Sequence, residues 1–501
     1  MSKAPAGLPP FTSPAGATPV ARRNPALLPA AARHLADRFT YGVTPALATE
    51  ILGFTSNREW FEAQLTRSQP QNLRATLVPT WFPLLANAPT LSAILAQQAL
   101  RGAYQVGNEL IARNLALRIL STHQVYETMC DFWANFLYIP ASEPRSFAWR
   151  VRYDDEVVRK HALGTYREML RAAVVHPAMA GYLTNDLNQK AGINENLGRE
   201  LLELHTVGAI YSEDDVLNSS RLLTGYTVAV TSNFAAGYDA NRHWVGPVKV
   251  LDFTHPNAEP DGRAALGEYL DYLAMHPATA RRIAQRLCVR FVSDQPPRAV
   301  VDAVARTYLR SGSDIKACLR TLVAHRAFRR SVRSKARTPS DDVVHTARVL
   351  GLTPAGAPTA NAFIYQLIGQ AGAMGQISLR WPAPDGWPEQ TQGYLSASRV
   401  LRSWRTHLDL AGTTGTALID VDVATKASQL PQTWPKTFEE VIDHQSQRII
   451  GQPAGAAVVA AIVRSTGIPA AQAITGPDDL TDLQYRLLRG TVLNSPAGLQ
   501  R

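Results

Sequence analysis

Helical periodicity is the feature that most constrains the fold of this 501-residue chain. Residues 90–137 contain no proline, and only Gly102 and Gly107 interrupt a run whose apolar residues recur at intervals of three and four. The same spacing continues over residues 154–174, and helical signals return from residue 261 to residue 350. This periodicity is typical of long helices that pack through one apolar face. The sequence therefore predicts a mainly α-helical fold with one large multi-helical domain.

Strand signals are confined to a single stretch. Residues 226–234 (YTVAVTSNF) and 243–253 (HWVGPVKVLDF) alternate Val and Thr with other side chains and flank a turn-rich segment. This pattern predicts one small β-hairpin insertion near residues 226–253. Pro247 indicates an edge strand, because proline has no N–H group to donate to a neighbouring strand.

The chain divides into three predicted regions. Residues 1–30 hold seven prolines among small residues and lack a continuous apolar segment, so we predict a flexible Pro/Ala-rich arm without a signal peptide. Residues 31–410 form the predicted helical domain, and residues 411–501 are expected to be a C-terminal helical segment packed on it. No stretch of about 18 apolar residues exists, so we expect no membrane span. These features favour a cytoplasmic location, with export alongside a partner as the alternative.

The net charge of +10 raises the question of anionic partners. Residues 281–337 hold fifteen basic residues against three acidic ones, but their aromatic residues fall at apolar helix positions. Recognition of single-stranded nucleic acid needs exposed aromatic rings beside the charge. We therefore interpret this stretch as a solvated basic face, and nucleic-acid binding is disfavoured. The three cysteines are odd in number and match no metal-binding spacing, so we expect neither a disulfide framework nor a zinc site.

The most unusual stretch is residues 194–208, which read NENLGRELLELHTVG. On an α-helix, Asn196, Glu200 and Glu203 form a wholly polar stripe beside a stripe of leucines. The two glutamates stand three residues apart, which separates their Cβ atoms by roughly 5–6 Å. Like charges that close together have separated proton affinities. Glu200 and Glu203 are therefore the predicted catalytic acid and base.

A solvated helix face is the competing interpretation of this stretch. Asn194 suits a helix N-cap and Glu195 suits the positive end of the helix dipole, so both also have structural explanations. Against a plain surface stands the crowding of hydrogen-bonding groups into a few turns. The residues predicted to bind substrate are Asn194, Glu195, Asn196, Arg199, His205, Asp385 and Trp387.

Several ordered motifs resemble those of one bacterial family. Residues 194–208, then IYSEDDV and RLLTGYT, resemble its hallmark: an Asn-Glu-Asn start, an Arg-Glu-Leu-x-Glu-Leu core and Tyr-Thr/Ser-Glu-x-Asp-Val. KHALGTYREML precedes them, and HPATARRIAQRLCVRFVSDQPP, RSKARTPSDDVV and GQAGAMGQISLRWPAPDGWPE follow in order. The matches cover roughly residues 30–410. The chain thus resembles the domain of unknown function 1800 family, a resemblance that implies no particular reaction.

The chain departs from that family's pattern at two places. Many members have Trp-x-Asn-His-Phe where residues 133–137 read WANFL, and many have His-Asp where this chain has His243 and Trp244. If those residues bind a metal in relatives, this chain lacks part of the set, so we predict no metal and no cofactor. The sequence also lacks a Gly-rich phosphate loop, a Gly-x-Ser-x-Gly elbow and a His-Glu-x-x-His motif.

An aromatic loop completes the predicted site. Residues 384–388 read PDGWP, in which Trp387 can stack on a sugar or pack on the core, and both alternatives stay open. Glycoside cleavage needs two carboxyl groups roughly 5–10 Å apart, and Asp385 can replace one helix glutamate as the second member. We therefore predict a hydrolase acting on a polysaccharide or glycoside, whose polar stripe shares one cleft with a ring from residues 381–404.

The alternative is a non-enzymatic partner or assembly factor for an exported protein or a cell-envelope system. The resemblance carries this idea, because genes of family members often lie beside genes for another, exported family. The acidic helix would then be a structural polar network in which Arg199 pairs with Glu195 or Glu203. Burial separates the two interpretations, because catalytic carboxylates should be accessible and structural ones enclosed.

Overall fold

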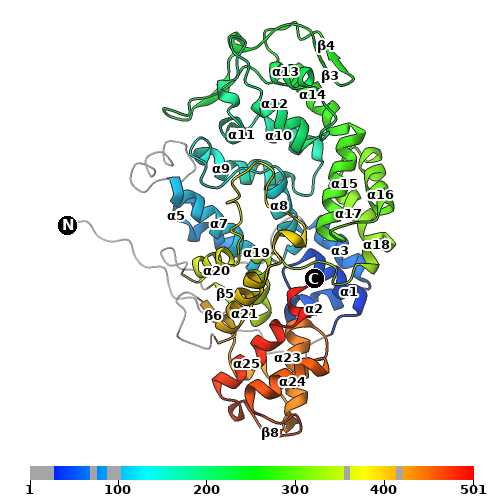
Figure 1. The fold of residues 1–501 in the computed structure, drawn as a ribbon, viewed down its shortest axis with the longest axis vertical. Helices are drawn as coiled ribbons and strands as arrows, with labels where there is room; N and C mark the ends of the chain where they lie inside the picture. Colours follow the sequence, from blue (N-terminus) through cyan, green and yellow to red (C-terminus); the bar gives the residue numbers. More distant parts are fainter. Residues whose placement is uncertain (1–26, 68–75, 87–102, 355–361, 413–420) are drawn as a thin grey trace, which may run out of the picture.

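The computed structural model describes residues 27–67, 76–86, 103–354, 362–412 and 421–501 (Figure 1). Helices dominate these ranges, and the strands within them form only short two-stranded sheets. The prediction of a mainly α-helical fold is thus confirmed. The predicted arm falls outside the described residues up to position 26, and so does the part of the 90–137 run that precedes residue 103.

The helices α5 to α13 of the N-terminal half build the upper and central parts of Figure 1, and α1 and α2 lie lower, at the right. Two of the helical segments, η2 (Asp154–Arg159) and η4 (Leu201–His205), are π-helices with wider turns. The others are α1 (Ala30–Phe39), α2 (Pro45–Leu52), α3 (Asn57–Thr66), η1 (Val78–Trp81), α5 (Pro83–Ala86), α7 (Ala103–Leu120), α8 (Gln124–Phe136), α9 (Phe147–Tyr153), α10 (Tyr166–Val174), α11 (Pro177–Tyr182), η3 (Asn185–Leu187), α12 (Asn196–Glu200), α13 (Glu213–Leu222) and η5 (Ala240–Arg242).

The C-terminal half is helical as well, and its first helix begins near the predicted position 261. Its elements are α14 (Arg263–Met275), α15 (Pro277–Phe291), α16 (Arg298–Arg310), α17 (Ile315–Ala324), α18 (Arg326–Arg330), α19 (Pro339–Leu350), α20 (Ala362–Ala373), η6 (Thr391–Gly393), α21 (Ala397–Ala411), α22 (Lys426–Gln429), α23 (Phe438–Ile450), α24 (Ala456–Thr466), η7 (Pro477–Asp479), α25 (Asp482–Leu493) and α26 (Pro496–Leu499).

Side-chain caps fix the starts of many helices. Ser212 and Asp215 form a reciprocal capping box at the start of α13. The predicted continuous helix over residues 154–174 is instead interrupted, because Thr165 caps a new helix at Tyr166 by accepting a hydrogen bond from the Glu168 N–H group. A cap of this kind supplies an acceptor to an N–H group that has no partner inside the helix.

The predicted single hairpin near residues 226–253 is wrong in detail, because the stretch forms two separate hairpins. Strand β1 (Tyr226–Val228) pairs antiparallel with β2 (Ala236–Tyr238), and β3 (Val248–Val250) pairs with β4 (Phe253–His255). The chain reverses within the predicted first strand, where Phe234 takes a left-handed backbone conformation (φ 55°). It reverses again at Leu251 (φ 52°), so neither predicted strand reaches full length.

The remaining strands form two further small sheets: β5 (Leu352–Pro354) with β6 (Val421–Val423), and β7 (Lys436–Thr437) with β8 (Ala473–Ile474). Each of the four sheets in the described ranges has two antiparallel strands.

Two large hydrophobic clusters organise the packing. The first joins α1, α3, α8, α10 and α14–α17, with Trp60 and Trp133 fully buried in it. The second joins α7, α19, α20, α23 and α25 around residues such as Phe438 and Leu488. Residues on both sides of position 410 thus share one core. The segment between α20 and α21 passes through the middle of the molecule, beside α8 (Figure 1).

Candidate active site

The acidic stretch begins its helix later than the sequence suggested and changes type within it. Helix α12 starts at Asn196, whose N–H group donates to the side chain of Asn194 at 3.1 Å. From Leu201 the chain continues as the π-helix η4. The Thr206 hydroxyl group donates to the Leu201 carbonyl at 2.6 Å, which helps hold the wider turn. The α-helical spacing assumed for Glu200 and Glu203 is therefore corrected, since η4 carries Glu203.

Glu200 lies half-buried at the end of α12. Burial raises the pKa of its carboxyl group, the negative charges of Glu203 and Asp385 raise it further, and Arg199 opposes them. Within the described residues, no hydrogen bond reaches this carboxylate. A carboxyl group that is partly desolvated and close to other acids holds its proton to a higher pH. Glu200 thus has the character of a proton donor.

Two neighbouring carboxylates are held differently. Glu203 accepts a hydrogen bond from the Tyr211 hydroxyl group at 2.5 Å, and Asp385 accepts one from Trp381 Nε1 at 2.7 Å. Such bonds fix the orientation of a carboxylate. Two acids from distant chain segments thus act on Glu200, and each of these two accepts a hydrogen bond from an aromatic side chain.

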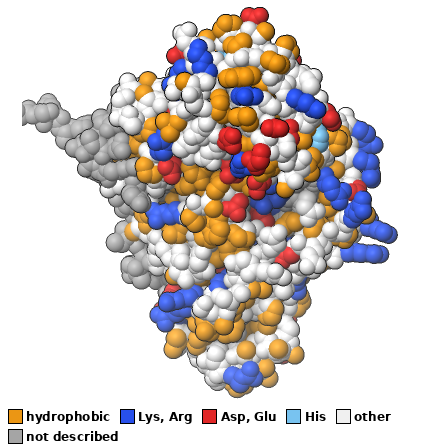
Figure 2. All heavy atoms as spheres, turned by 45° about the horizontal axis from the view of Figure 1, so that its top comes forward, with side chains coloured by type: hydrophobic (Ala, Val, Ile, Leu, Met, Phe, Trp, Pro, Cys, Tyr) orange, Lys and Arg blue, Asp and Glu red, His pale blue; other side chains and the backbone are white. Residues whose placement is uncertain are grey.

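A fourth acid and a tyrosine extend this group. Burial raises the pKa of Tyr182, and the charges of Glu143, Glu200 and Asp385 raise it further. We call Glu143, Glu200, Glu203 and Asp385 the acid cluster. Figure 2 shows acidic side chains gathered near the centre of the face that it presents. The acid cluster therefore combines several carboxylates with a half-buried phenol.

The loop that carries Asp385 is anchored to α8. Asn135 donates from its amide group to the Trp387 carbonyl at 2.8 Å and accepts from the Trp387 N–H group at 2.7 Å. The Tyr138 hydroxyl group accepts from the Trp381 N–H group at 2.6 Å and donates to its carbonyl at 2.9 Å. Gly386 has φ +71°, and a Cβ atom there would lie 2.2 Å from the Asn135 carbonyl oxygen. The loop is thus held close to the helix that lies beneath it.

The other predicted binding residues lie in different surroundings. Arg199 pairs with Glu213 at 2.7 Å and with Glu195 at 3.2 Å. Asn196 is exposed, while Asn194 is half-buried. His205 is only 1% exposed, burial lowers its pKa to about 3, and its ring has no hydrogen-bond partner in the described residues. The structure therefore places His205 in the core, apart from the surface on which the acid cluster lies.

Trp387 contributes to the loop more than to a free surface. Its ring is half-buried, lies 4.6 Å from the ring of Trp381 between centroids, and donates from Nε1 to the Ile377 carbonyl at 3.0 Å. Trp381, also half-buried, is the ring that contacts Asp385. In the sequence, Trp381 stood out only as part of an aromatic region, and Tyr211 only as part of a family motif. Nothing in the sequence pointed to Glu143 or Tyr182.

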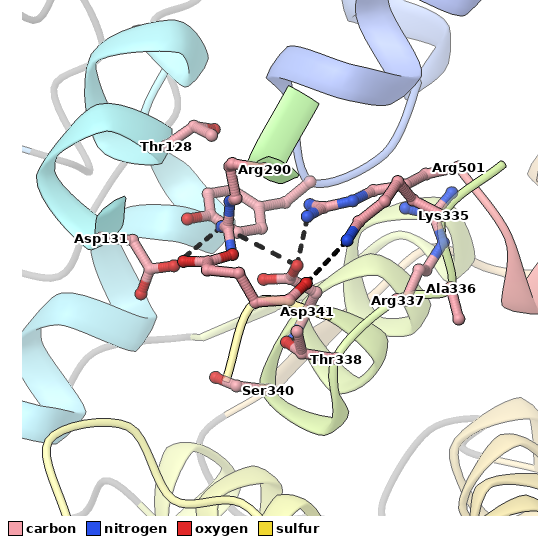
Figure 3. Close-up of polar contacts among 12 residues, drawn as sticks. Thr128, Asp131, Arg290, Lys335, Ala336, Arg337, Thr338, Ser340, Asp341 and Arg501 are labelled. Carbon is pink, nitrogen blue, oxygen red and sulfur yellow. Dashed lines mark hydrogen bonds and ion pairs between the residues drawn. The ribbon is translucent and has the colours of Figure 1, made fainter. Parts of the chain in front are cut away.

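An enclosed ion-pair network lies inside the molecule (Figure 3). The loop that carries Asp385 contributes Glu389 to it. Arg290 of α15 pairs with Asp131 of α8 at 2.9 Å, with Glu389 at 3.1 Å and with Asp341 of α19 at 3.9 Å. Asp341 also pairs with Arg501 at 2.8 Å. We call these five residues the ion-pair core.

The ion-pair core is enclosed. The side chains of Arg290 and Glu389 are each 4% exposed, and the charge of Arg290 counteracts burial to hold the pKa of Glu389 below its usual value. A cavity of about 30 Å³ lies against Arg290 and Glu389, which is enough room for roughly one water molecule. Because the ion-pair core is enclosed and joins α8, α15 and α19, its role is to hold these helices together. The acid cluster, in contrast, is accessible.

No group of three or more His, Cys, Asp or Glu residues in the described ranges is arranged to hold a metal ion. None of the helices that the structure describes has the length and apolarity needed to cross a bilayer.

The fold and the site define a class: a mainly helical protein with an accessible acid cluster and an enclosed ion-pair core, both in contact with the loop between α20 and α21. The family model described as "Protein of unknown function (DUF1800)" matches residues 34–497. The chain belongs to this family, as the sequence motifs predicted. No curated protein matches the chain, and no solved structure matches it.

Proposed function

We propose that this protein is a hydrolase that cleaves a polysaccharide or another glycoside at the acid cluster. The observation that carries the proposal is the contrast between Glu200 and its neighbours. Glu200 has a raised pKa and no hydrogen bond within the described residues, whereas Glu203 and Asp385 each accept one from an aromatic side chain. Neighbouring carboxyl groups with separated proton affinities can divide the roles of acid and base.

In this proposal Glu200 donates its proton to the oxygen of the glycosidic bond as that bond breaks. Asp385 or Glu203, each held in place by its hydrogen bond, either activates a water molecule or attacks the sugar directly. Asp385 is the better candidate, because it lies on a loop far from α12 in the sequence. A glycosidase places its two carboxyl groups on either side of the bond, which one helix cannot easily do.

The pairing of Arg199 also supports an accessible site. Its guanidinium group pairs with Glu195 and Glu213, so neither predicted catalytic glutamate is in an ion pair with it. A structural network in the acidic stretch would instead require buried, paired carboxylates, as the ion-pair core shows.

The proposal is tested by screening the purified chain against a broad polysaccharide panel with a reducing-end assay. Glu200→Gln keeps the side-chain shape and should lower the rate on any substrate found by about 10²–10⁴-fold. Glu259→Gln, at an exposed position, is the matched control and should retain full activity.

Hydrolysis that Glu200→Gln leaves unchanged would contradict the assignment of the acid. A correctly folded wild-type protein that cleaves nothing on the panel would favour the second candidate, a non-enzymatic partner or assembly factor for an exported protein or cell-envelope system.

A further inference from the structure

A separate groove lies where α13 meets the hairpin of β3 and β4. It has a volume of about 530 Å³, within the usual range for small-molecule sites. Helix α13 packs on β3, which lines the groove, and also on α12, which carries Glu200 of the acid cluster. The side chains that matter in the groove are those of Asn218, Arg221, Pro247, Lys249, His255 and Pro256.

The guanidinium group of Arg221 is held in place but keeps N–H groups that make no hydrogen bond in the described residues. One terminal nitrogen donates to Asn218 Oδ1 at 2.9 Å, and the group lies 4.4 Å from the ring centroid of Trp244. Asn218 is itself fixed by donating to the Lys249 carbonyl at 3.0 Å. Arg221 Nε is buried without a hydrogen-bond partner, and Arg221 makes no ion pair in the described ranges. A buried donor without a partner is costly, so an added acceptor would be stabilising.

The other side of the groove adds a second permanent cation. Lys249 is exposed and has no ion-pair partner among the described residues. The nearby acid Asp215 already accepts hydrogen bonds from the Ser212 and Leu251 N–H groups. His255 accepts from the Asn257 N–H group at 2.9 Å, which leaves its other ring nitrogen 3.9 Å from a Glu268 oxygen. The residues that line the groove therefore include two permanent cations and no carboxylate.

We propose that this groove binds a small ligand through a carboxylate, phosphate or sulfate group held between Arg221 and Lys249. Arginine binds such groups through two parallel hydrogen bonds, and lysine adds a compact charge. Pro247 and Pro256 supply rigid apolar walls for the rest of the ligand. The proposal does not depend on hydrolysis at the acid cluster.

Isothermal titration of the full chain with inorganic phosphate at low ionic strength tests the proposal. We expect saturable binding of one phosphate, weakened at least tenfold in Lys249→Gln, whose exposed side chain should be replaceable without change in melting temperature. Arg221→Lys keeps the charge but loses the two-bond geometry, and it should also bind more weakly. Arg326→Gln removes an exposed arginine from another groove and is the matched control.

Further titrations separate the sources of the anion. Sulfate and glucuronate should compete with phosphate, and the tighter of them identifies the preferred group, whereas neutral glucose should not compete. Binding that Lys249→Gln leaves intact, or that Arg326→Gln weakens equally, would overturn the proposal. Equal competition by glucose would overturn it as well.

Discussion

Replacing glutamate by glutamine should lower stability at one place and not at another. Glu389→Gln removes a charge from the ion-pair core, where the carboxylate is 4% exposed and lies 3.1 Å from Arg290. Breaking a buried pair usually costs about 3–5 kcal/mol. Arg290 keeps Asp131 as a partner, so we expect the lower end of that range, about 3 kcal/mol.

The expected shift in melting temperature follows from the size of the chain. Unfolding entropy of about 2.1 cal/mol/K per residue amounts to about 1 kcal/mol/K over 501 residues. Glu389→Gln should therefore melt about 3 °C below wild type. Glu200→Gln relieves repulsion among acids, so it should melt at or slightly above the wild-type temperature.

Circular dichroism melts and urea titrations of both variants at pH 7 provide the comparison. Because the two changes are chemically identical, differences in side-chain volume do not enter. An unchanged melting temperature for Glu389→Gln would refute the role given to the ion-pair core. A drop for Glu200→Gln as large as that for Glu389→Gln would show that the acid cluster is structural too.

Three further predictions concern backbone strain, pH and thiol reactivity. Gly386→Ala places a Cβ atom 2.2 Å from the Asn135 carbonyl oxygen, so the loop should detach and shift the tryptophan fluorescence; an unchanged spectrum and melt would contradict this. The pKa of His205 is about 3 in the folded chain and about 6.5 in the unfolded chain. The free energy of unfolding therefore keeps its full value above pH 6.5 and falls as the pH drops toward 3, because only the unfolded chain takes up the proton. At pH 5 the free energy of unfolding is lower by about 2 kcal/mol, and His205→Leu should flatten this part of the stability profile. Burial raises the pKa of Cys130, Cys288 and Cys318, so Ellman's reagent should label no thiol in the native chain and three after unfolding; rapid labelling before unfolding would disprove their burial.

The sequence predicted the helices well because their signals are local. Apolar periodicity and capping residues such as Ser212 act within a few turns, so one segment carries the information. The hairpin was mispredicted because the chain reverses at two residues, Phe234 and Leu251, whose backbones take left-handed conformations. Residues other than glycine rarely adopt this conformation, so their residue types did not predict the reversals.

The candidate site was only partly predictable for a different reason. The glutamates of residues 194–208 stand out by composition, but the periodicity gave no indication of the π-turn at η4, where the Thr206 hydroxyl group donates to the Leu201 carbonyl. The proximity of Asp385 to Glu200 depends on the anchoring of a distant loop by Asn135 and Tyr138. Such contacts between remote segments have no periodic pattern in the sequence.

The protonation of Glu200 tests the central claim most directly. Its carboxyl group can be followed by carbon-detected NMR in wild type and in Asp385→Asn. We predict that the pKa of Glu200 lies above the ordinary value for a glutamate in wild type, and that Asp385→Asn lowers it because one of the two neighbouring negative charges is removed. A Glu200 carboxyl group that titrates at the ordinary glutamate value, and that Asp385→Asn does not affect, would contradict a proton donor set up by the acid cluster.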